Sequence, residues 1–217
     1  MKCHCLSFYK KIYIMNNIKE LTLEQHKNAE RQEFVKILMS GEINPELYAT
    51  YLYNQLQCYI ELEKWGMHNA LFRQTPGLQR AEKIHKDFSL LWSKEDKPVI
   101  TQSTKEYVEH LNTISDDPEK VYAHIYVRHL GDLSGGQMIS KKVPVRNYYD
   151  FGANGQEWKR IVKEIINQYL NTYQINVVAE ARLCFEYATR LFGEMNDLSY
   201  RDTENDPFRG TSMEGKD

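Results

Sequence analysis

The sequence has little of what marks several large protein classes. It contains only four cysteines in 217 residues, Cys3, Cys5, Cys58 and Cys184, and their spacing fits neither a disulfide framework nor a four-ligand metal site. No apolar run approaches the roughly 20 residues that a membrane-spanning helix needs. The net charge is only −2, which argues against a general nucleic-acid or anionic-membrane binder. We therefore expect a protein of a reducing compartment whose partners must be inferred from particular sites.

Sustained apolar alternation, the sign of a β-strand, is also missing. Apolar spacings of three and four residues are common instead, and a capping side chain before proline marks helix starts at 44–45, 75–76 and 117–118. Ser103 to Glu106 forms a capping box, and Gly41 is placed as a helix C-cap. These signals predict an all-α, single-domain fold with helices at 16–29, 31–40, 45–69, 76–92, 103–114, 118–142, 155–172 and 176–198.

The two ends of the chain are expected to lie outside this domain. Residues 1–14 lack the apolar core and cleavage site of a signal peptide, and residues 199–217 are polar. We predict a disordered N-terminal extension over 1–14, a domain over 15–198 and a disordered tail over 199–217. A soft metal bound by Cys3-His4-Cys5 is a minor alternative for the extension, because no second pair of ligands accompanies it.

The segment HLGDLSGGQ, residues 129–137, places three glycines within six residues of a predicted helix. Each glycine costs a helix roughly 1 kcal/mol relative to alanine. A short loop between two helices would also use Gly135 and Gly136, but apolar residues continue at helical spacing on both sides, which favours one kinked helix. Bare backbone at this point would let a flat ligand approach closely.

Two segments carry a resemblance to a known family. The run Tyr126-Val-Arg-His-Leu-Gly-Asp-Leu-Ser-Gly-Gly-Gln137 resembles the distal-helix signature of heme oxygenases, which lies over one face of the heme. Glu24-Gln-His-Lys-Asn-Ala-Glu30, followed by Phe34, is similar to the family's proximal helix, which carries the iron-ligating histidine. With Tyr59, the resemblance spans residues 16–198. It implies a fold in which heme is sandwiched between a proximal helix and a glycine-kinked distal helix.

The resemblance implies a role for each residue that matches the family pattern. His26 would be the axial ligand of the heme iron, and Glu30, one turn later, would bind its other ring nitrogen. Asp132, with Arg128 and Tyr59, would hold a water network that directs activated oxygen onto the porphyrin ring. Without the resemblance, Arg128 and Asp132 would be interpreted as an ordinary ion pair one helical turn apart.

Further residues would contact the heme itself. Lys19 lies seven residues before His26, two turns earlier on a continuous helix, and would reach a propionate. The family usually has arginine at the position of Lys163. A lysine is a point charge and cannot bind a propionate through two parallel hydrogen bonds as arginine does, so the rotational setting of the heme is less defined. The sequence therefore does not determine which meso carbon is opened. The propionate contacts implied are Lys19, Tyr126, Lys159 and Lys163. The glycines Gly131, Gly135 and Gly136 would clear space for heme, oxygen and water, and Ser134 beside them is a further heme-binding residue.

Two other functions compete with this interpretation. Glu82-x-x-His85 is half of a ferritin-like di-iron pattern, but the sequence contains no second such motif. A non-catalytic helical heme carrier is the stronger alternative, because His26 and a pocket could bind heme without turnover. Asp132 distinguishes the two functions, since a carrier has no need of this carboxylate.

The resemblance thus implies an enzyme that uses heme b as substrate and oxygen-activating cofactor and yields biliverdin, carbon monoxide and ferrous iron. The sequence has no glycine fingerprint for flavin or nicotinamide, so neither is expected, and electrons would come from a partner, either ferredoxin or a reductase. A downstream bilin reductase is a further candidate partner; nucleic acid and membranes are not. We expect the cytoplasm, plastid or soluble phase of a host cell. An acidic electron donor could dock on a face formed by six basic residues, Lys141, Lys142, Arg146, Lys159, Arg160 and Lys163.

Overall fold

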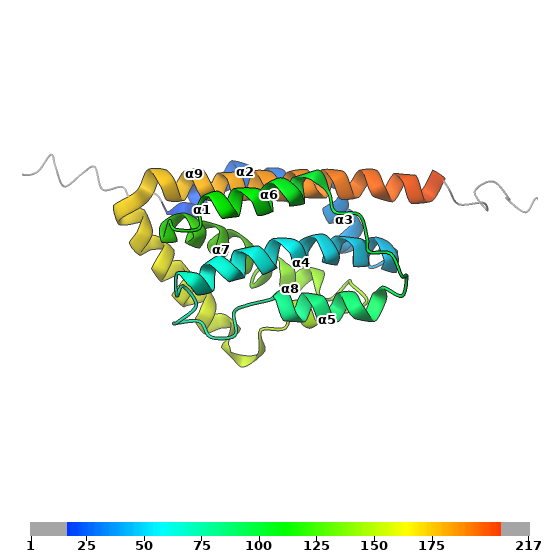
Figure 1. The fold of residues 1–217 in the computed structure, drawn as a ribbon, viewed down its shortest axis with the longest axis horizontal. Coiled ribbons are helices and arrows are strands. Elements are labelled where there is room, and N and C mark those ends of the chain that lie inside the picture. Colours follow the sequence, from blue (N-terminus) through cyan, green and yellow to red (C-terminus); the bar gives the residue numbers. More distant parts are fainter. Residues whose placement is uncertain (1–16, 205–217) are drawn as a thin grey trace, which may run out of the picture.

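The computed structural model describes residues 17–204, and these residues form helices and turns without any strand. The predicted all-α class is therefore confirmed (Figure 1). The helices are α1 (Ile18–Leu21), α2 (Leu23–Glu30), α3 (Glu33–Ser40), α4 (Pro45–His68), α5 (Ala81–Leu91), α6 (Gln102–Thr113), α7 (Pro118–Asp132), α8 (Gly136–Ile139) and α9 (Gly155–Glu204), with the 3-10 turns η2 (Asn147–Tyr149) and η3 (Gly152–Asn154).

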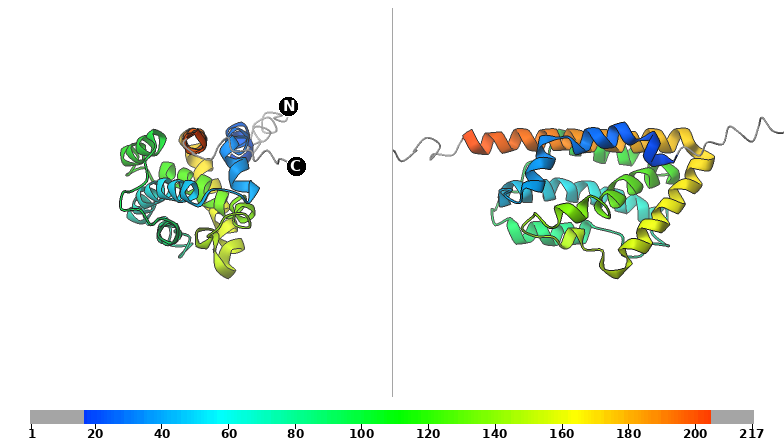
Figure 2. Two further views of the ribbon diagram at one scale, coloured as in Figure 1. Left: turned by 90° about the vertical axis from the view of Figure 1, so that its right-hand side faces the viewer. Right: turned by 180° about the vertical axis from the view of Figure 1, so that it is seen from behind.

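The long helix α9 organises the molecule. It is bent at Tyr173, whose φ of −125° and ψ of 35° are not helical, so the two helices predicted over 155–172 and 176–198 meet at a kink. Helices α1, α2, α3, α6 and α7 all pack against α9, as the three ribbon views show (Figures 1 and 2). The last helical residue is Glu204, six residues beyond the predicted helix end at 198, and the predicted 1–14 extension and most of the 199–217 tail lie outside the described residues.

Several predicted helix ends are confirmed. The Asn44 side chain accepts hydrogen bonds from the backbone N–H groups of Glu46 (2.8 Å) and Leu47 (3.3 Å), so it caps α4 ahead of Pro45. Gly41 ends α3 with a φ of 86°, a left-handed conformation that glycine adopts without steric cost.

The helix start predicted at Thr75-Pro76 is wrong. Residues 71–77 form turns and a bend, residues 78–80 have no regular structure, Gly77 has a φ of 87°, and α5 begins only at Ala81. The buried carboxylate of Glu63 in α4 accepts hydrogen bonds from the backbone N–H groups of Arg80 and Ala81, which provides the N-terminal cap. The cap comes from another helix, so no local pattern could indicate it.

The capping box predicted at Ser103 is also wrong. The side chain of Thr101 caps α6 by accepting from the Thr104 N–H at 3.3 Å. Ser103 instead donates from its hydroxyl to Glu194 of α9 over 2.7 Å, and so joins two helices.

Two predicted helices are divided in the structure. The 16–29 helix is interrupted at Thr22, between α1 and α2. The 118–142 helix ends at Asp132, continues as a turn over 133–135, and resumes only as the four-residue α8. The glycine-rich segment is therefore a break between two helices rather than a kink within one.

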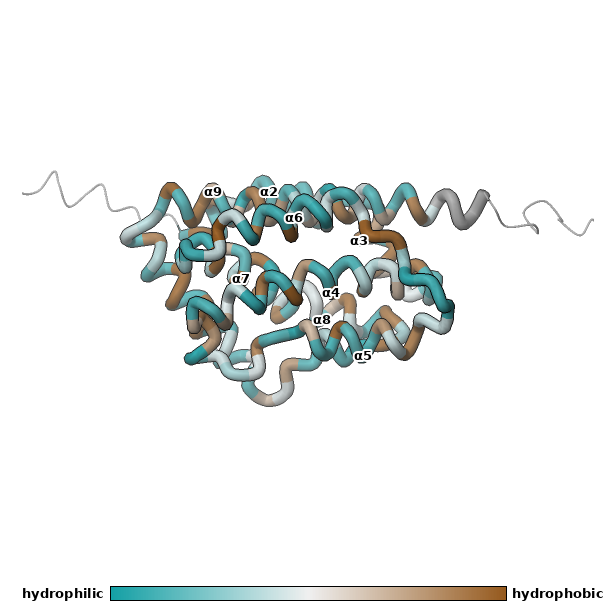
Figure 3. The backbone as a smooth tube through the Cα atoms, in the orientation of Figure 1, coloured by the Kyte–Doolittle hydropathy of each residue, from teal (hydrophilic) through white to brown (hydrophobic). Residues whose placement is uncertain are grey.

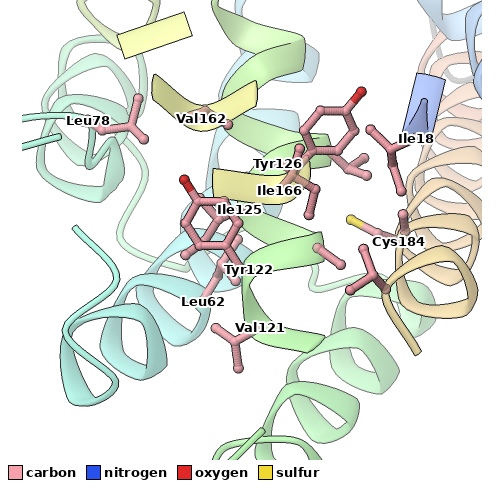
Figure 4. Close-up of a cluster of buried hydrophobic side chains, with 14 of the residues drawn as sticks. Ile18, Leu62, Leu78, Val121, Tyr122, Ile125, Tyr126, Val162, Ile166 and Cys184 are labelled. Carbon is pink, nitrogen blue, oxygen red and sulfur yellow. The ribbon is translucent and has the colours of Figure 1, made fainter. Parts of the chain in front are cut away.

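The apolar core lies between α4, α7 and α9, where helix faces meet. Figure 3 shows hydrophobic positions recurring along these helices among hydrophilic ones, as expected of helices with one buried side. In Figure 4, Ile18 of α1 lies beside Tyr126 of α7, and Ile166 of α9 lies nearby. Within residues 17–204, no helix is both long enough and apolar enough to cross a membrane.

Candidate active site

The segment after α7 exposes bare backbone. Among the described residues, a Cβ added at Gly131 would meet no atom within 4 Å, and one at Gly135 would meet only the Gly131 carbonyl at 3.7 Å. A Cβ at Gly136 would instead lie 2.7 Å from the ring of Tyr149. Gly131 and Gly135 therefore leave open space, as expected for a flat ligand, whereas Gly136 is required by packing against Tyr149.

Two tyrosines hold the carboxylate of Asp132 at the end of α7. The hydroxyl of Tyr59 in α4 donates to Oδ2, and the hydroxyl of Tyr148 in η2 donates to Oδ1 over 2.9 Å. The two hydroxyl oxygens are 3.2 Å apart. Burial raises the pKa of Asp132 to about 6 although both hydrogen bonds lower it, and burial also raises the pKa of each tyrosine, so both remain donors.

Tyr148 is a site residue that sequence reasoning missed. It lies in a turn, and neither its neighbours nor its spacing from Asp132 distinguishes it from the other tyrosines of the chain. Its position depends on Asp87 of α5, a buried carboxylate that accepts from the Tyr148 N–H (2.8 Å) and from the N–H (3.2 Å) and side-chain amide (2.6 Å) of Asn147.

Arg80 makes a second connection to the same turn. This arginine is 1% exposed, and its guanidinium donates to the carbonyl oxygens of Tyr148 (3.4 Å) and Asp150 (2.7 Å). Its Nε donates to the carbonyls of Leu78 and Gln79 in its own loop, so the guanidinium joins that loop to the turn at Tyr148 and Asp150. The positive charge of Arg80 lowers the pKa of Asp132 against the larger effect of burial.

Arg128 makes no ion pair with Asp132, although one turn separates them. Its guanidinium donates to Gln55 Oε1 over 2.9 Å and lies 4.2 Å from the ring centre of Tyr107. It also lies 5.7 Å from the ring centre of Tyr59. Any influence of Arg128 on Asp132 would act through Tyr59 rather than by contact.

His26 lies on α2 with 40% of its side chain exposed. Its Nε2 is 3.4 Å from a carboxylate oxygen of Glu30, and its ring centre is 5.3 Å from that of Phe185 in α9. Arg182, one turn earlier on α9, donates twice to the carbonyl of Leu21 and so anchors the start of α2. The His26 imidazole therefore packs against Phe185 of α9, while part of the ring stays accessible to solvent.

The predicted propionate contacts are spread over three helices. Lys19 is exposed on α1, and because Thr22 interrupts the helix, the predicted continuous two turns between Lys19 and His26 are not present. Tyr126 is 7% exposed, and burial raises its pKa to about 12. Lys159 and Lys163 on α9 make no ion pair with any described residue.

The predicted site residues fall into two groups. Asp132 and Tyr59 are in direct contact, whereas no hydrogen bond or ion pair among the described residues joins His26 to either. A surface cavity of about 600 Å³ is lined in part by Leu133 and Gln137 of the glycine-rich segment, but neither His26 nor Asp132 lines it. Ser134 is exposed next to Gly135.

The residues present fit a heme. An accessible imidazole with a carboxylate beside it is the usual donor for heme iron. Gly131 and Gly135 have no side chain and no neighbour that would fill the space, so a flat macrocycle could lie against their backbone. Two lysines without described partners provide positive charge for carboxylates.

Comparisons with known proteins show similarity to heme oxygenases. A sequence profile described as heme oxygenase matches residues 13–194. Heme oxygenase 2 of Macaca fascicularis is 31% identical over 88% of this chain and 69% of the relative. The heme oxygenase of Guillardia theta is 29% identical over 84% of this chain and 86% of the relative.

Solved structures share the fold. Heme oxygenase-1 from the cyanobacterium Synechocystis, in complex with heme, has a TM-score of 0.72 at 22% identity and covers 86% of this chain and 94% of that one. Heme oxygenase from Leptospira interrogans has a TM-score of 0.72 at 26% identity and covers 82% of this chain and 97% of that one. On the extent of these matches, the chain belongs to the heme oxygenase family.

Proposed function

We propose that this chain cleaves heme oxidatively to biliverdin, carbon monoxide and ferrous iron, with the substrate held between α2 and the residues from Gly131 to Gly136. The observation that carries the proposal is the carboxylate of Asp132, fixed by two tyrosine hydroxyls one residue from the open space at Gly131. A heme carrier needs only the iron-ligating histidine and the pocket. A carboxylate that is fixed by two hydroxyl donors beside the heme face serves proton transfer.

Heme, when bound, supplies both the ring that is cleaved and the iron that activates oxygen. On the α2 side, His26 supplies a neutral imidazole nitrogen, and Glu30 orients the ring through its other nitrogen. Phe185 limits how far the imidazole can turn, because the two ring centres are only 5.3 Å apart.

On the α7 side, Asp132 holds and releases a proton. A pKa of about 6 lets the carboxyl change protonation state near neutral pH. Tyr59 and Tyr148 occupy one oxygen each, so the carboxylate cannot rotate, and its remaining lone pairs can accept from water on the side of Gly131. The bare backbone of Gly131 and Gly135 leaves room for that water.

Four residues are proposed to bind the propionates: Lys19, Tyr126, Lys159 and Lys163. Lys159 and Lys163 lie one turn apart on α9 and have no described carboxylate partner, so their charges are available to an anionic ligand. Lysine contacts are less directional than those of arginine. We therefore expect the heme to be held in place mainly by the two helices.

Hemin titration followed by turnover tests the proposal. Wild-type protein should give a sharp Soret band of a histidine-ligated ferric heme and, with reductant and oxygen, biliverdin. His26→Ala should lose that ligation spectrum. Asp132→Asn should retain heme binding but lose most of the bilin yield. Heme binding without bilin from the wild-type protein would favour the carrier instead.

Electrons are proposed to come from an acidic partner, ferredoxin before a reductase. Lys141, Lys142 and Arg146 are exposed, but Arg160 pairs with Glu157 and Glu164, which weakens the basic face at that point. Charge reversal at Lys141 and Lys142 should lower activity with ferredoxin and leave activity with a chemical reductant unchanged. If the variant is as active as the wild type with ferredoxin, this face is not the docking site of the donor.

A further inference from the structure

A cluster of three ligand-type side chains lies outside the set of residues proposed to bind heme. It consists of His110 of α6, His124 of α7 and Glu180 of α9, whose ligand atoms all lie within 4.8 Å of one another. Both histidines direct Nε2 at the same carboxylate oxygen, Glu180 Oε2, over 2.7 Å from His110 and 3.0 Å from His124. Three helices therefore bring two imidazole nitrogens and one carboxylate oxygen to a single point.

We propose that this cluster binds a divalent transition-metal ion of the zinc type. Two histidines and one glutamate form a known three-ligand zinc set, in which water takes the fourth position. Bond lengths of about 2.0–2.2 Å in a tetrahedral site place ligand atoms about 3.3 Å apart. The observed separations of 2.7 and 3.0 Å from Glu180 Oε2 need to widen by about 0.6 and 0.3 Å, and the two imidazole nitrogens lie within 4.8 Å of each other.

The burial of the three side chains suits a site that is open on one side. His124 is fully buried, whereas the side chains of His110 and Glu180 are 19% and 12% exposed. The two partly exposed ligands can adjust their positions, and an ion can enter from their side. Nitrogen donors select zinc, copper, nickel or cobalt over magnesium and calcium, which prefer oxygen.

A metal here would tie α6 and α9 to α7. His124 lies eight residues before Asp132 on the same helix, so the ion would stabilise the helix that presents the proposed catalytic carboxylate. The ion lies outside the proposed reaction and would act on stability. Its effect should therefore appear in the heme-free chain.

The proposal is tested by zinc equilibrium dialysis of the full chain. His110→Ala should bind one zinc ion fewer than the wild type, or bind it at least about tenfold more weakly. His68→Ala is the matched control, because His68 is an exposed helical histidine 3.6 Å from Asp116 without a third ligand. Equal zinc binding by the wild type and His110→Ala would overturn the proposal.

Two further measurements test the proposal even if His110→Ala does not fold. Zinc, but not magnesium, should raise the Tm of the wild type, and the rise should be smaller in Glu180→Gln. Cobalt bound to the wild type should give the visible absorption of a tetrahedral nitrogen–oxygen site. A cobalt spectrum dominated by thiolate charge transfer would assign the metal to Cys3 and Cys5 and contradict the proposal.

Discussion

Tyr148 donates a hydrogen bond to Asp132 over 2.9 Å, although it follows Asp132 by sixteen residues and belongs to a different element. Tyr59 binds the other carboxylate oxygen from α4. The carboxylate is thus fixed from two sides by donors that are buried and remain protonated.

Replacement of Tyr148 by phenylalanine should shift the pH dependence of turnover. The Tyr148 hydroxyl lowers the pKa of Asp132, so Tyr148→Phe should raise that pKa above about 6, and the acidic limb of the rate profile should move to higher pH. A shift of up to about one pH unit is expected, which lowers the rate up to about twofold at pH 7 and several-fold at pH 6. Initial rates of biliverdin formation across pH measure it.

Tyr149→Phe is the matched control for that variant. The Tyr149 ring stacks on Tyr148 with ring centres 4.3 Å apart, but its hydroxyl makes no hydrogen bond to Asp132. Its pH profile should follow the wild type. Identical profiles for Tyr148→Phe and the wild type would show that the hydroxyl does not act on the carboxylate.

Asp132→Asn should make the heme-free protein more stable above pH 6. Burial raises the pKa of Asp132 from its ordinary value of 3.8 to about 6, so the folded state binds this proton more tightly than the unfolded state. The wild type therefore loses stability as the pH rises between these values. Asparagine does not titrate, and the gain in unfolding free energy should be on the order of 1–3 kcal/mol.

Urea denaturation of the two proteins at pH 4 and pH 8 measures this difference. The advantage of Asp132→Asn should be present at pH 8 and should become small near pH 4, where the folded carboxyl is protonated and the unfolded carboxyl is close to its own midpoint of 3.8. A variant that is less stable than the wild type at pH 8 would mean that the charge of Asp132 is well compensated by its neighbours.

Asp87→Ala should weaken both the fold and the site. Asp87 accepts three hydrogen bonds from Asn147 and Tyr148, and its loss leaves those donors without a partner. The expected cost is about 2–4 kcal/mol of unfolding free energy. If Asp87 acts through Tyr148, the effects of Asp87→Ala and Tyr148→Phe on turnover should not add in the double variant.

Asp150→Ala serves as the comparison for Asp87→Ala. Asp150 accepts from the Gly152 N–H over 2.8 Å at an exposed turn of the same connection, and its loss should cost less than about 1 kcal/mol. Additive effects on turnover in the Asp87 and Tyr148 double variant would assign Asp87 a structural role only.

Alanine at Gly131 and at Gly136 should have opposite consequences. At Gly136 the new Cβ would lie 2.7 Å from the Tyr149 ring, so Gly136→Ala should destabilise the protein by about 1–3 kcal/mol. At Gly131 it meets nothing, so Gly131→Ala should leave the heme-free protein as stable as the wild type or up to about 1 kcal/mol more stable.

The two glycine variants differ in heme binding as well. Gly131→Ala adds a methyl group to the proposed heme face and should lower hemin affinity or bilin yield, whereas a thermal melt without heme should not show a loss. Unchanged hemin affinity and turnover in Gly131→Ala would remove this glycine from the proposed site.

Much of the fold could be predicted because its signals are local. Asn44-Pro45 and Gly41 set helix ends through groups within three residues, and the three- and four-residue apolar spacing indicates helices directly. The start of α5 could not be predicted, because its cap is Glu63 of α4. A long-range cap leaves no pattern in the residues around it.

Residue identity and local spacing were enough to predict the helical class and the family, and the resemblance grouped Tyr59 with Asp132 in one water network. Helix packing was needed to show that the Tyr59 and Tyr148 hydroxyls bind Asp132 directly, that Arg128 binds Gln55 instead, and that Gly136 packs against Tyr149. The reason is physical: these contacts join elements distant in sequence, and a side chain selects its partner by position after the helices have packed.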